Sequence, residues 1–291
     1  MTGKAVAIAH GAATIVNAIA LGKGAAFGVD LWTRAEIKLT DEPGVIRAEI
    51  VSDPKESTLL IEKTAARVLQ RFGLEKTFGV KVKTLSNIPV ARGLKSSSVA
   101  ANATALATTA ALGKTLDGLE IVKLGVEAAF DAKVTVTGAF DDACASYFGG
   151  IVITDNLKRE IIKQLPLPKD LTVLFHVPPQ KAYTADSNVN RLQTVKPLVQ
   201  IAFDRALEGK VWDALTLNGL IYSSASKLNT TIAIDALVAG AVAAGLCGKG
   251  PAITAVVPND KVDAVKAALQ RYEGEIIQAH LNCEKAKVLQ Q

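Results

Sequence analysis

The chain has 291 residues, about twice the length of a typical domain, so two lobes or one large domain are expected. With 49% hydrophobic and 21% charged residues, the composition excludes intrinsic disorder. The 33 basic and 28 acidic residues give a formal charge of +5, and they are not gathered into the runs typical of nucleic-acid-binding tails. This balance suits an anionic small-molecule ligand.

The polar residues with special chemistry are sparse. Three widely spaced cysteines outside any C-x-x-C pattern favour a reducing compartment over a disulfide framework. The three histidines lie far apart in apolar stretches, which favours buried or strand-face positions over zinc binding. The apolar run 5–21 is interrupted by His10 and Asn17, and the run 232–247 is too short to cross a bilayer. We therefore expect a soluble, cytoplasmic protein with no membrane association.

The N-terminal half alternates between strand-like and helix-like patterns. In chain order the predicted elements are strand 34–40, strand 45–51, helix 58–71, strand 78–85, helix 99–112 and a helix from Asp117 to about residue 129. The first two strands are expected to pair across the Glu-Pro-Gly turn between them. Asp117 and Glu120 form a capping-box-like helix start.

The C-terminal half continues the mixture. Its predicted elements are strands at 134–136, 149–154 and 171–177, helices at 189–207, 212–226 and 232–244, strand 252–257, helix 261–272 and strand 275–280. The segment 156–170 is rich in Lys and Pro and is the expected boundary between lobes 1–157 and 158–291. Because the elements lack a regular βαβ alternation, an α+β fold is favoured.

The strongest local signal is the run P-V-A-R-G-L-K-S-S-S-V-A-A at residues 89–101. A glycine and three serines precede a helix of small residues, and the free N–H groups and dipole of a helix start favour an anion. Serine hydroxyls and Lys95 could add contacts to a phosphate or a metal. The alternative is that one serine merely caps the helix. No Walker A pattern is present, and no G-x-G-x-x-G follows a strand.

This run resembles the P-x-x-x-G-L-G-S-S-A-A phosphate loop of the GHMP kinases, the superfamily of galactokinase, homoserine kinase and mevalonate kinase. The run G-K-G-P at 248–251 resembles their glycine-rich third motif, and Thr184 with Arg191 resembles a T-x-x-x-R-type segment of homoserine-kinase-like members. The phrases T-I-V-N-A-I (14–19) and G-A-F-D-D-A (138–143) resemble most the archaeal-type shikimate kinase branch. Lys95 departs from the pattern, because the superfamily usually has glycine there.

The resemblance implies an α+β, two-lobed GHMP kinase fold, with an N-terminal lobe like ribosomal protein S5 and a ferredoxin-like C-terminal lobe. It implies phosphorylation of shikimate by ATP with Mg²⁺; homoserine or mevalonate is the alternative acceptor. A non-catalytic sensor of the same fold would be signalled by loss of the phosphate loop or the acidic pair, and both are present. A nucleic-acid-binding module is disfavoured, because the charges are dispersed and lack interleaved aromatics. A homodimer is compatible with the resemblance.

The resemblance also implies a set of site residues. Those for the nucleotide are Pro89, Arg92, Gly93, Leu94, Lys95, Ser96, Ser97, Ser98, Gly248 and Gly250. Those for shikimate, a carboxylate with three hydroxyls, are Thr14, Asn17, Asp30, Lys181, Thr184 and Arg191. For Asn17 and Asp30 a buried structural hydrogen bond is the alternative. Mg²⁺ would be held by Ser97, Ser98 and Glu127, with Glu120 as the other eligible glutamate and a helix-face charge as the alternative for both.

Asp141 and Asp142 are the candidate catalytic bases. Counting forward to the paired glycines at 149–150 places Asp141 in register with homoserine-kinase-like members. Counting from the serine of S-x-x-G-G places Asp142 in register with mevalonate-kinase-like members, so the choice stays open with Asp141 preferred. A helix cap is the alternative for one of them. Lys23 is a third catalytic candidate, as a partner of the aspartate or of the phosphoryl group, or else a solvated turn lysine.

Overall fold

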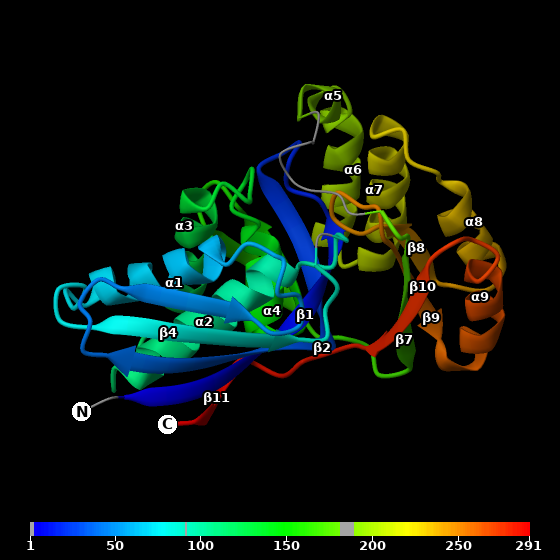
Figure 1. Cartoon of the computed structure of the whole chain (residues 1–291). Helices are drawn as coiled ribbons and strands as arrows, with labels where there is room; N and C mark the ends of the chain where they lie inside the picture. Colours follow the sequence, from blue (N-terminus) through cyan, green and yellow to red (C-terminus); the bar gives the residue numbers. More distant parts are fainter. Residues whose placement is uncertain (1–2, 91, 181–188) are drawn as a thin grey trace.

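The computed structural model describes residues 3–90, 92–180 and 189–291 and places two sheets next to each other (Figure 1). The larger sheet contains β1 (Lys4–Val16), β2 (Lys23–Thr40), β3 (Ile46–Ile50), β4 (Gly79–Ser86), β5 (Ile151–Asp155), β6 (Glu160–Leu165) and β11 (Lys287–Gln290). Its main strand order is β11-β1-β2-β4-β3, and β5 pairs with both β2 and β6. The smaller sheet contains β7 (Leu171–Val177), β8 (Ala243–Leu246), β9 (Ile253–Pro258) and β10 (Glu275–His280), in the order β10-β7-β9-β8.

Helices cover one face of each sheet (Figure 1). Those packed with the larger sheet are α1 (Leu59–Arg71), α2 (Ser96–Ala111), α3 (Gly118–Asp131) and α4 (Phe140–Phe148). The later helices are α5 (Val189–Gln193), α6 (Lys196–Leu207), α7 (Val211–Ala225), α8 (Thr231–Val238) and α9 (Val262–Leu269), with a 3₁₀ turn at Asn259–Lys261 before the last. The expected α+β, two-lobed architecture is confirmed.

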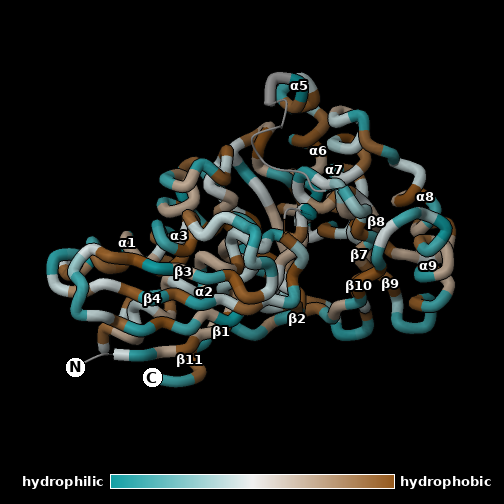
Figure 2. Tube along the Cα trace, in the orientation of Figure 1, coloured by the Kyte–Doolittle hydropathy of each residue, from teal (hydrophilic) through white to brown (hydrophobic). Residues whose placement is uncertain are grey.

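The central helix α2 explains the composition. Most of its residues are buried, and nearly all of these are Ala or Thr. Short side chains let one helix pack at the same time against β1, β2 and the neighbouring helices. Figure 2 shows hydrophilic residues along the loops that join the strands of the smaller sheet, as expected for connections that face water.

The pairing of β3 differs from the expectation. β2 pairs along Thr33–Thr40 with β4 in antiparallel register, so β3 is left with the outer edge of β4 and lies parallel to it. Helix α1 lies between β3 and β4 in the chain, and a helical crossover of this kind returns the chain in the parallel direction. The predicted hairpin between residues 34–40 and 45–51 is therefore wrong.

The structure differs from the predictions in several further places. The helix expected at 189–207 is divided into α5 and α6, because Pro197 occupies the start of α6 and disfavours helical geometry before it. Residues 243–244 belong to β8 rather than to a helix, and 134–136 form no strand. β6 pairs with β5, and β11 returns to pair with β1, so the larger sheet includes residues on both sides of the expected boundary at 157.

The histidines occupy strands, as expected: His10 lies in β1, His176 is buried in β7 and His280 is exposed in β10. Within residues 3–90, 92–180 and 189–291, no three His, Cys, Asp or Glu side chains come together as a metal cluster. No helix in the same ranges has the length and apolarity required to traverse a bilayer.

Candidate active site

Four segments that are distant in the sequence enclose one pocket. They are the end of β1 with the turn after it (residues 14–19), the start of α2 with the loop before it (93–98), the segment 134–142 and the glycine-rich loop 248–250. The pocket therefore combines the phosphate-loop run, the acidic pair and the second glycine-rich run identified in the sequence. Nothing in the local sequence of any one segment indicates this meeting.

The phosphate-loop run turns into α2 at Lys95, which is the N-cap residue and has a left-handed backbone (φ 63°). α2 begins at Ser96, three residues earlier than expected, so the three serines form its first turn and line the pocket. Because Lys95 holds the N-cap position, the interpretation of a serine as a mere cap is wrong. Gly93 packs so tightly that a Cβ there would lie 2.5 Å from the Cys247 carbonyl oxygen. Leu94 is buried beneath the loop.

The acidic pair forms the first turn of α4, where the helix dipole favours negative charge. Asp142 Oδ2 makes an ion pair with Lys95 Nζ at 3.0 Å, and both side chains are about nine-tenths buried. Asp141 Oδ1 accepts a hydrogen bond from Asn156 Nδ2 at 2.8 Å. Its second oxygen rests on β2, where a Cβ at Gly24 would lie 2.3 Å from it. The two neighbouring carboxylates thus have different partners.

Their electrostatic environments also differ. Burial and the charge of Asp142 raise the pKa of Asp141 to about 7, although Lys95 and the Asn156 hydrogen bond act against this rise. Asp142 Oδ1 is buried and has no hydrogen-bond partner within the described part of the chain. A buried carboxylate oxygen of this kind is costly unless a ligand completes its shell. Among the described residues, Asp142 therefore contributes a buried carboxylate oxygen whose hydrogen-bonding capacity is unused.

Thr14 and Asn17 line the pocket but already serve the backbone. Thr14 Oγ1 accepts a hydrogen bond from Gly248 N at 3.0 Å, and Asn17 Nδ2 donates to Gly248 O at 2.9 Å. Asn17 N also donates to the Asn218 side chain of α7 at 3.1 Å. These bonds tie the turn after β1 to the glycine-rich loop, as the structural alternative for Asn17 expects.

Several predicted site residues lie elsewhere. Lys23 is exposed, with its Nζ 6.0 Å from the centre of the Phe203 ring, because its strand position directs it away from the acidic pair. Asp30 is exposed and accepts a hydrogen bond from His280 N at 2.7 Å, so its role is to join β2 to β10. Arg191 donates to the Ala225 carbonyl at the end of α7 and does not line the pocket. Lys181 and Thr184 lie outside the described residues.

Pro89 and Arg92 are also outside the pocket lining. They line two other hollows together, and Arg92 donates to the Pro178 carbonyl. Arg92 therefore joins the run to the end of β7 instead of facing the serines. Gly250 lines the pocket, in the turn that follows Gly248.

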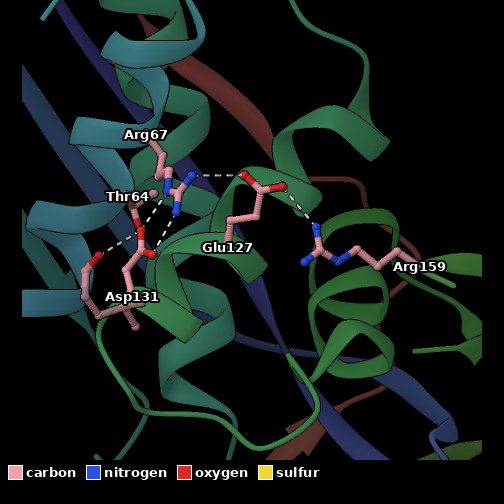
Figure 3. Close-up of polar contacts among 6 residues, drawn as sticks. Thr64, Arg67, Glu127, Asp131 and Arg159 are labelled. Atoms are coloured by element: carbon pink, nitrogen blue, oxygen red, sulfur yellow. Dashed lines mark hydrogen bonds and ion pairs between the residues drawn. The ribbon is translucent and has the colours of Figure 1, made fainter. Parts of the chain in front are cut away.

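Glu127 belongs to an ion-pair network on the surface of α3 (Figure 3). Its two oxygens face Arg159 at 2.9 Å and Arg67 at 3.7 Å, and Arg67 also binds Asp131 at 2.6 Å. Glu120 is likewise paired, with Arg71 at 2.9 Å. Neither glutamate lines the pocket, so the expected metal-ligand role of Glu127 has no support in its position. The helix-face interpretation describes both residues.

Sequence reasoning missed part of the lining, which includes Ala18, Ile19, Val134, Thr135, Val136, Thr137, Ala139 and Lys249. The segment 134–136 was expected to be a strand, but two features keep it out of the sheet. Gly138 (φ 81°) and Ala139 (φ 48°) both have left-handed backbones that turn the chain into α4. Asn156 was missed because it meets Asp141 only in the folded chain.

The residues present fit a nucleotide phosphate and a hard cation. The open helix start, the Ser97 and Ser98 hydroxyls and two lining lysines are suited to phosphate oxygens. The serine hydroxyls that line the pocket are a ligand type that Mg²⁺ accepts. This site resembles neither a Walker A loop nor a dinucleotide fold, so the class must be defined by fold and site together.

The fold and the pocket define a small-molecule kinase of the GHMP class. Residues 60–150 match the model of the GHMP kinases N terminal domain. The chain is similar in fold to homoserine kinase from Cytophaga hutchinsonii, with a TM-score of 0.77 and 18% identity over 99% of this chain and 98% of that one. It is also similar to the Methanococcus jannaschii mevalonate kinase, with a TM-score of 0.76 and 17% identity over 95% and 98% of the two chains.

Full-length relatives narrow the class. The chain is 47% identical to a shikimate kinase of Methanosarcina mazei over 97% of this chain and 96% of that protein. It is 41% identical to a shikimate kinase of Pyrococcus furiosus over 91% and 95% of the two chains. The chain belongs to the family of these shikimate kinases. The resemblance to the archaeal-type branch, which rested on T-I-V-N-A-I and G-A-F-D-D-A, is thereby confirmed.

Proposed function

We propose that this chain transfers the γ-phosphoryl group of ATP, with Mg²⁺, to a hydroxyl of shikimate, giving shikimate 3-phosphate and ADP. The family of full-length relatives supports the acceptor. The observation that supports the chemistry is the buried pair of Lys95 and Asp142, which lies between the start of α2 and the open part of the pocket. A kinase must position two substrates and neutralise charge on the transferring group, and this pocket contains groups for both tasks.

In this proposal the nucleotide phosphates lie against the start of α2. Backbone N–H groups of residues 96–98 point outwards from the first turn, and the helix dipole adds favourable potential there. The Gly248 and Gly250 backbone forms the opposite wall. Ser97 and Ser98 are the proposed protein ligands of Mg²⁺, which supplies charge neutralisation for the phosphate oxygens when bound.

We assign the role of base to Asp142, although the sequence alone slightly favoured Asp141. Proton transfer requires geometry first, and Asp142 lines the described pocket with a buried carboxylate oxygen, Oδ1, that has no hydrogen-bond partner among the described residues. The acceptor oxygen forms a bond to the γ-phosphorus while the bond from that phosphorus to the bridging oxygen of ADP breaks. The hydroxyl proton passes to Asp142 Oδ1. Asp141 is the neighbouring carboxyl group and accepts a hydrogen bond from Asn156.

The acceptor is proposed to lie between the turn at residues 17–19 and the segment 134–137, which face the pocket beside the acidic pair. Among the described lining residues the cations are Lys95 and Lys249. Lys249 lines the pocket on the glycine-rich loop and is the proposed cation for the acceptor carboxylate. Thr135 and Thr137 offer hydroxyls to the ring.

The three cysteines are free, and two of them are buried. Free buried thiols are typical of proteins kept in a reducing compartment, so we place the activity in the cytoplasm.

The test is an ADP-release assay with Mg-ATP and one acceptor at a time: shikimate, homoserine or mevalonate. Turnover with shikimate and a product whose ³¹P NMR spectrum and mass match a phosphate monoester of shikimate would support the proposal. Turnover with only homoserine or mevalonate would refute the acceptor but leave the kinase class intact. The Asp142→Asn protein serves as the control for contaminating kinases, because it should fail with every acceptor.

A further inference from the structure

Lys95 occupies a position that is unfavourable for a lysine on two counts. Its backbone is left-handed (φ 63°), a conformation that side chains with a Cβ rarely adopt and that glycine adopts at no cost. Its side chain is about nine-tenths buried, and a buried ammonium loses its hydration. A residue held in this way persists only where its surroundings compensate for it, and such sites are often functional.

The compensation comes from both sides of the pocket. Asp142 Oδ2 lies 3.0 Å from the ammonium, and Asp141 adds a second negative group on the same helix. On the other side, the missing side chain of Gly248 leaves room for the ammonium, because a Cβ there would lie 2.5 Å from Lys95 Nζ. Burial opposes the charge of Lys95, but Asp142, Cys247 and Asp141 outweigh it and raise the pKa of the lysine. The ammonium is therefore charged and held between the two loops.

Its position relative to the helix start gives the ammonium a second neighbour. Lys95 is the N-cap residue of α2, so it directly precedes the first turn, and it lines the same pocket as Ser96, Ser97 and Ser98. The backbone N–H groups of this turn are those that the proposed function assigns to the phosphates. One cation thus lies between the anion-binding helix start and the carboxylate that is proposed to take the proton.

We propose that Lys95 is a catalytic residue that acts at two places in the transfer: its ammonium, 3.0 Å from Asp142 Oδ2, favours the charged form of the acidic pair, and it stabilises negative charge on the phosphoryl group as that group moves to the acceptor. This inference rests on the proposed function. It assigns to the phosphate loop itself the cation that the sequence had suggested for Lys23. Preorganised charge in a water-poor pocket is among the largest contributions to catalysis.

Other charged groups face the same place, and the test must hold them constant. Asp141 and Asp142 approach from α4, and Cys247 and Lys249 from the glycine-rich loop. The Tyr222 hydroxyl of α7 accepts a hydrogen bond from Ala20 N in the turn after β1, and the charge of Asp141 contributes to raising the pKa of this tyrosine. A substitution confined to Lys95 leaves all of these unchanged.

The experiment compares the wild type with Lys95→Gly. Glycine suits the left-handed backbone, so this variant removes the cation and relieves strain in the main chain. We expect kcat for the kinase reaction to fall about 100-fold or more, with a much smaller change in the KM of the acceptor. The acid limb of the pH–kcat profile should move to higher pH, because the carboxylates lose the cation that favours their ionised form. Added methylammonium should restore part of the activity.

A second readout needs neither ATP nor an acceptor. In ¹³C-labelled protein without ligands, the carboxyl signals of the Asp141–Asp142 pair should titrate at higher pH in Lys95→Gly than in the wild type. Lys227→Gly is the matched control, because Lys227 also has a left-handed backbone (φ 60°) but is exposed and outside the pocket lining. Its titration and activity should equal those of the wild type.

An unchanged titration of the pair in Lys95→Gly, or an unchanged kcat, would overturn the inference. If Lys95→Gly did not fold, Lys95→Gln would replace it, since glutamine keeps an N–H donor on a side chain one bond shorter but lacks the charge; the same shift is expected. A wild type without turnover on shikimate would refute the proposed acceptor, whereas the titration would still decide the role of Lys95 toward the pair.

Discussion

Two adjacent aspartates in the first turn of α4 have different surroundings and therefore different properties. Asp142 is paired with a buried ammonium and has one buried oxygen without a described partner, whereas Asp141 is held by an amide donor and rests on a glycine of β2. Burial and the neighbouring charge raise the pKa of Asp141 to about 7, so near neutral pH this carboxyl is only partly ionised. Small changes in the surroundings of Asp141 can therefore change its charge.

A substitution separates the two roles. Asp142→Asn should lower kcat by about 1,000-fold or more, because the amide cannot take the hydroxyl proton and leaves Lys95 without its anion. ATP affinity, measured by calorimetry in the presence of Mg²⁺, should change far less than kcat.

The matched variant Asp141→Asn should retain more activity than Asp142→Asn, because Asn156 can still meet an amide at residue 141. Its pH–kcat profile should also lose the part that titrates near pH 7. If Asp141→Asn were the more damaging of the two, the role of base would belong to Asp141.

Gly248 provides a second prediction at this scale. Gly248→Ala would place a methyl group only 2.5 Å from Lys95 Nζ, and the backbone there is left-handed (φ 62°). We expect the KM for ATP to rise and kcat to fall, because the ammonium must move away from Asp142. Gly113→Ala is the control: its backbone has nearly the same angle (φ 63°), and no atom lies within 4 Å of the added methyl group. It should cost about 1–2 kcal/mol of stability without a change in KM.

At the scale of elements, local patterns were predictive and long-range pairings were not. α1 and α3 form almost where the periodicity and the Asp117 capping box predicted them, because those signals lie within a few residues of each other. The pairing of β3 with β4 depends on which of these two strands pairs with the edge of β2. The sequence of β3 does not indicate that β4 takes this place. β11 was missed because its partner lies almost the whole chain away.

The site follows the same division. Ser96–Ser98 and Gly248 could be predicted because a phosphate loop needs glycine and hydroxyl groups at fixed spacing. The cation that pairs with Asp142 could not be predicted, because both Lys23 and Lys95 carry the required charge. Only the folded chain shows that Lys95 reaches Asp142, whereas Lys23 lies by Phe203. Asn156 and Thr14 gain their roles only through contacts across more than ten residues.

The ion pairs of α3 give a prediction at this scale. Glu127→Gln should leave the Mg²⁺ dependence of turnover unchanged, because Glu127 is bound to arginines outside the pocket (Figure 3). Its stability should fall by about 1 kcal/mol or less, as expected for a partly exposed pair. Ser97→Ala is the comparison, and it should raise the Mg²⁺ concentration needed for half-maximal rate. A matching rise in Glu127→Gln would restore the glutamate to the metal site.

At the scale of the whole molecule, hydrogen bonds at the pocket connect the turn after β1 of the larger sheet to α7 and to the glycine-rich loop after β8 of the smaller sheet. Asn17 in the turn after β1 binds Asn218 of α7 and Gly248 of the glycine-rich loop, and Tyr222 of α7 donates to the Asn17 carbonyl oxygen at 3.2 Å. These partners lie about 200 residues from Asn17 in the chain, and all of these groups are buried. The pocket walls therefore depend on correct docking of both sheets, so global stability and site geometry are linked.

That stability should depend on pH through His176 of β7. The side chain is buried, and its burial lowers the pKa from the ordinary value of 6.5 despite nearby backbone groups that favour the charged form. The unfolded chain therefore binds a proton more readily than the folded one. The stability from neutral His176 is fully present above pH 6.5 and is lost as the pH falls below that value toward the lowered pKa. His10, whose pKa is also lowered, acts in the same direction, and Asp141, whose pKa is raised, acts in the opposite one.

The histidine contribution can be isolated by difference. The wild type and His176→Gln carry the same His10 and Asp141, so urea unfolding at pH 7.5 and pH 5.0 should show a smaller loss of unfolding free energy in the variant. Glutamine does not titrate in this range, which removes the proton uptake by the unfolded state at this position. His280→Gln, on the exposed face of β10, should behave like the wild type at both pH values. Equal losses in the wild type and His176→Gln would show that other groups carry the acid sensitivity.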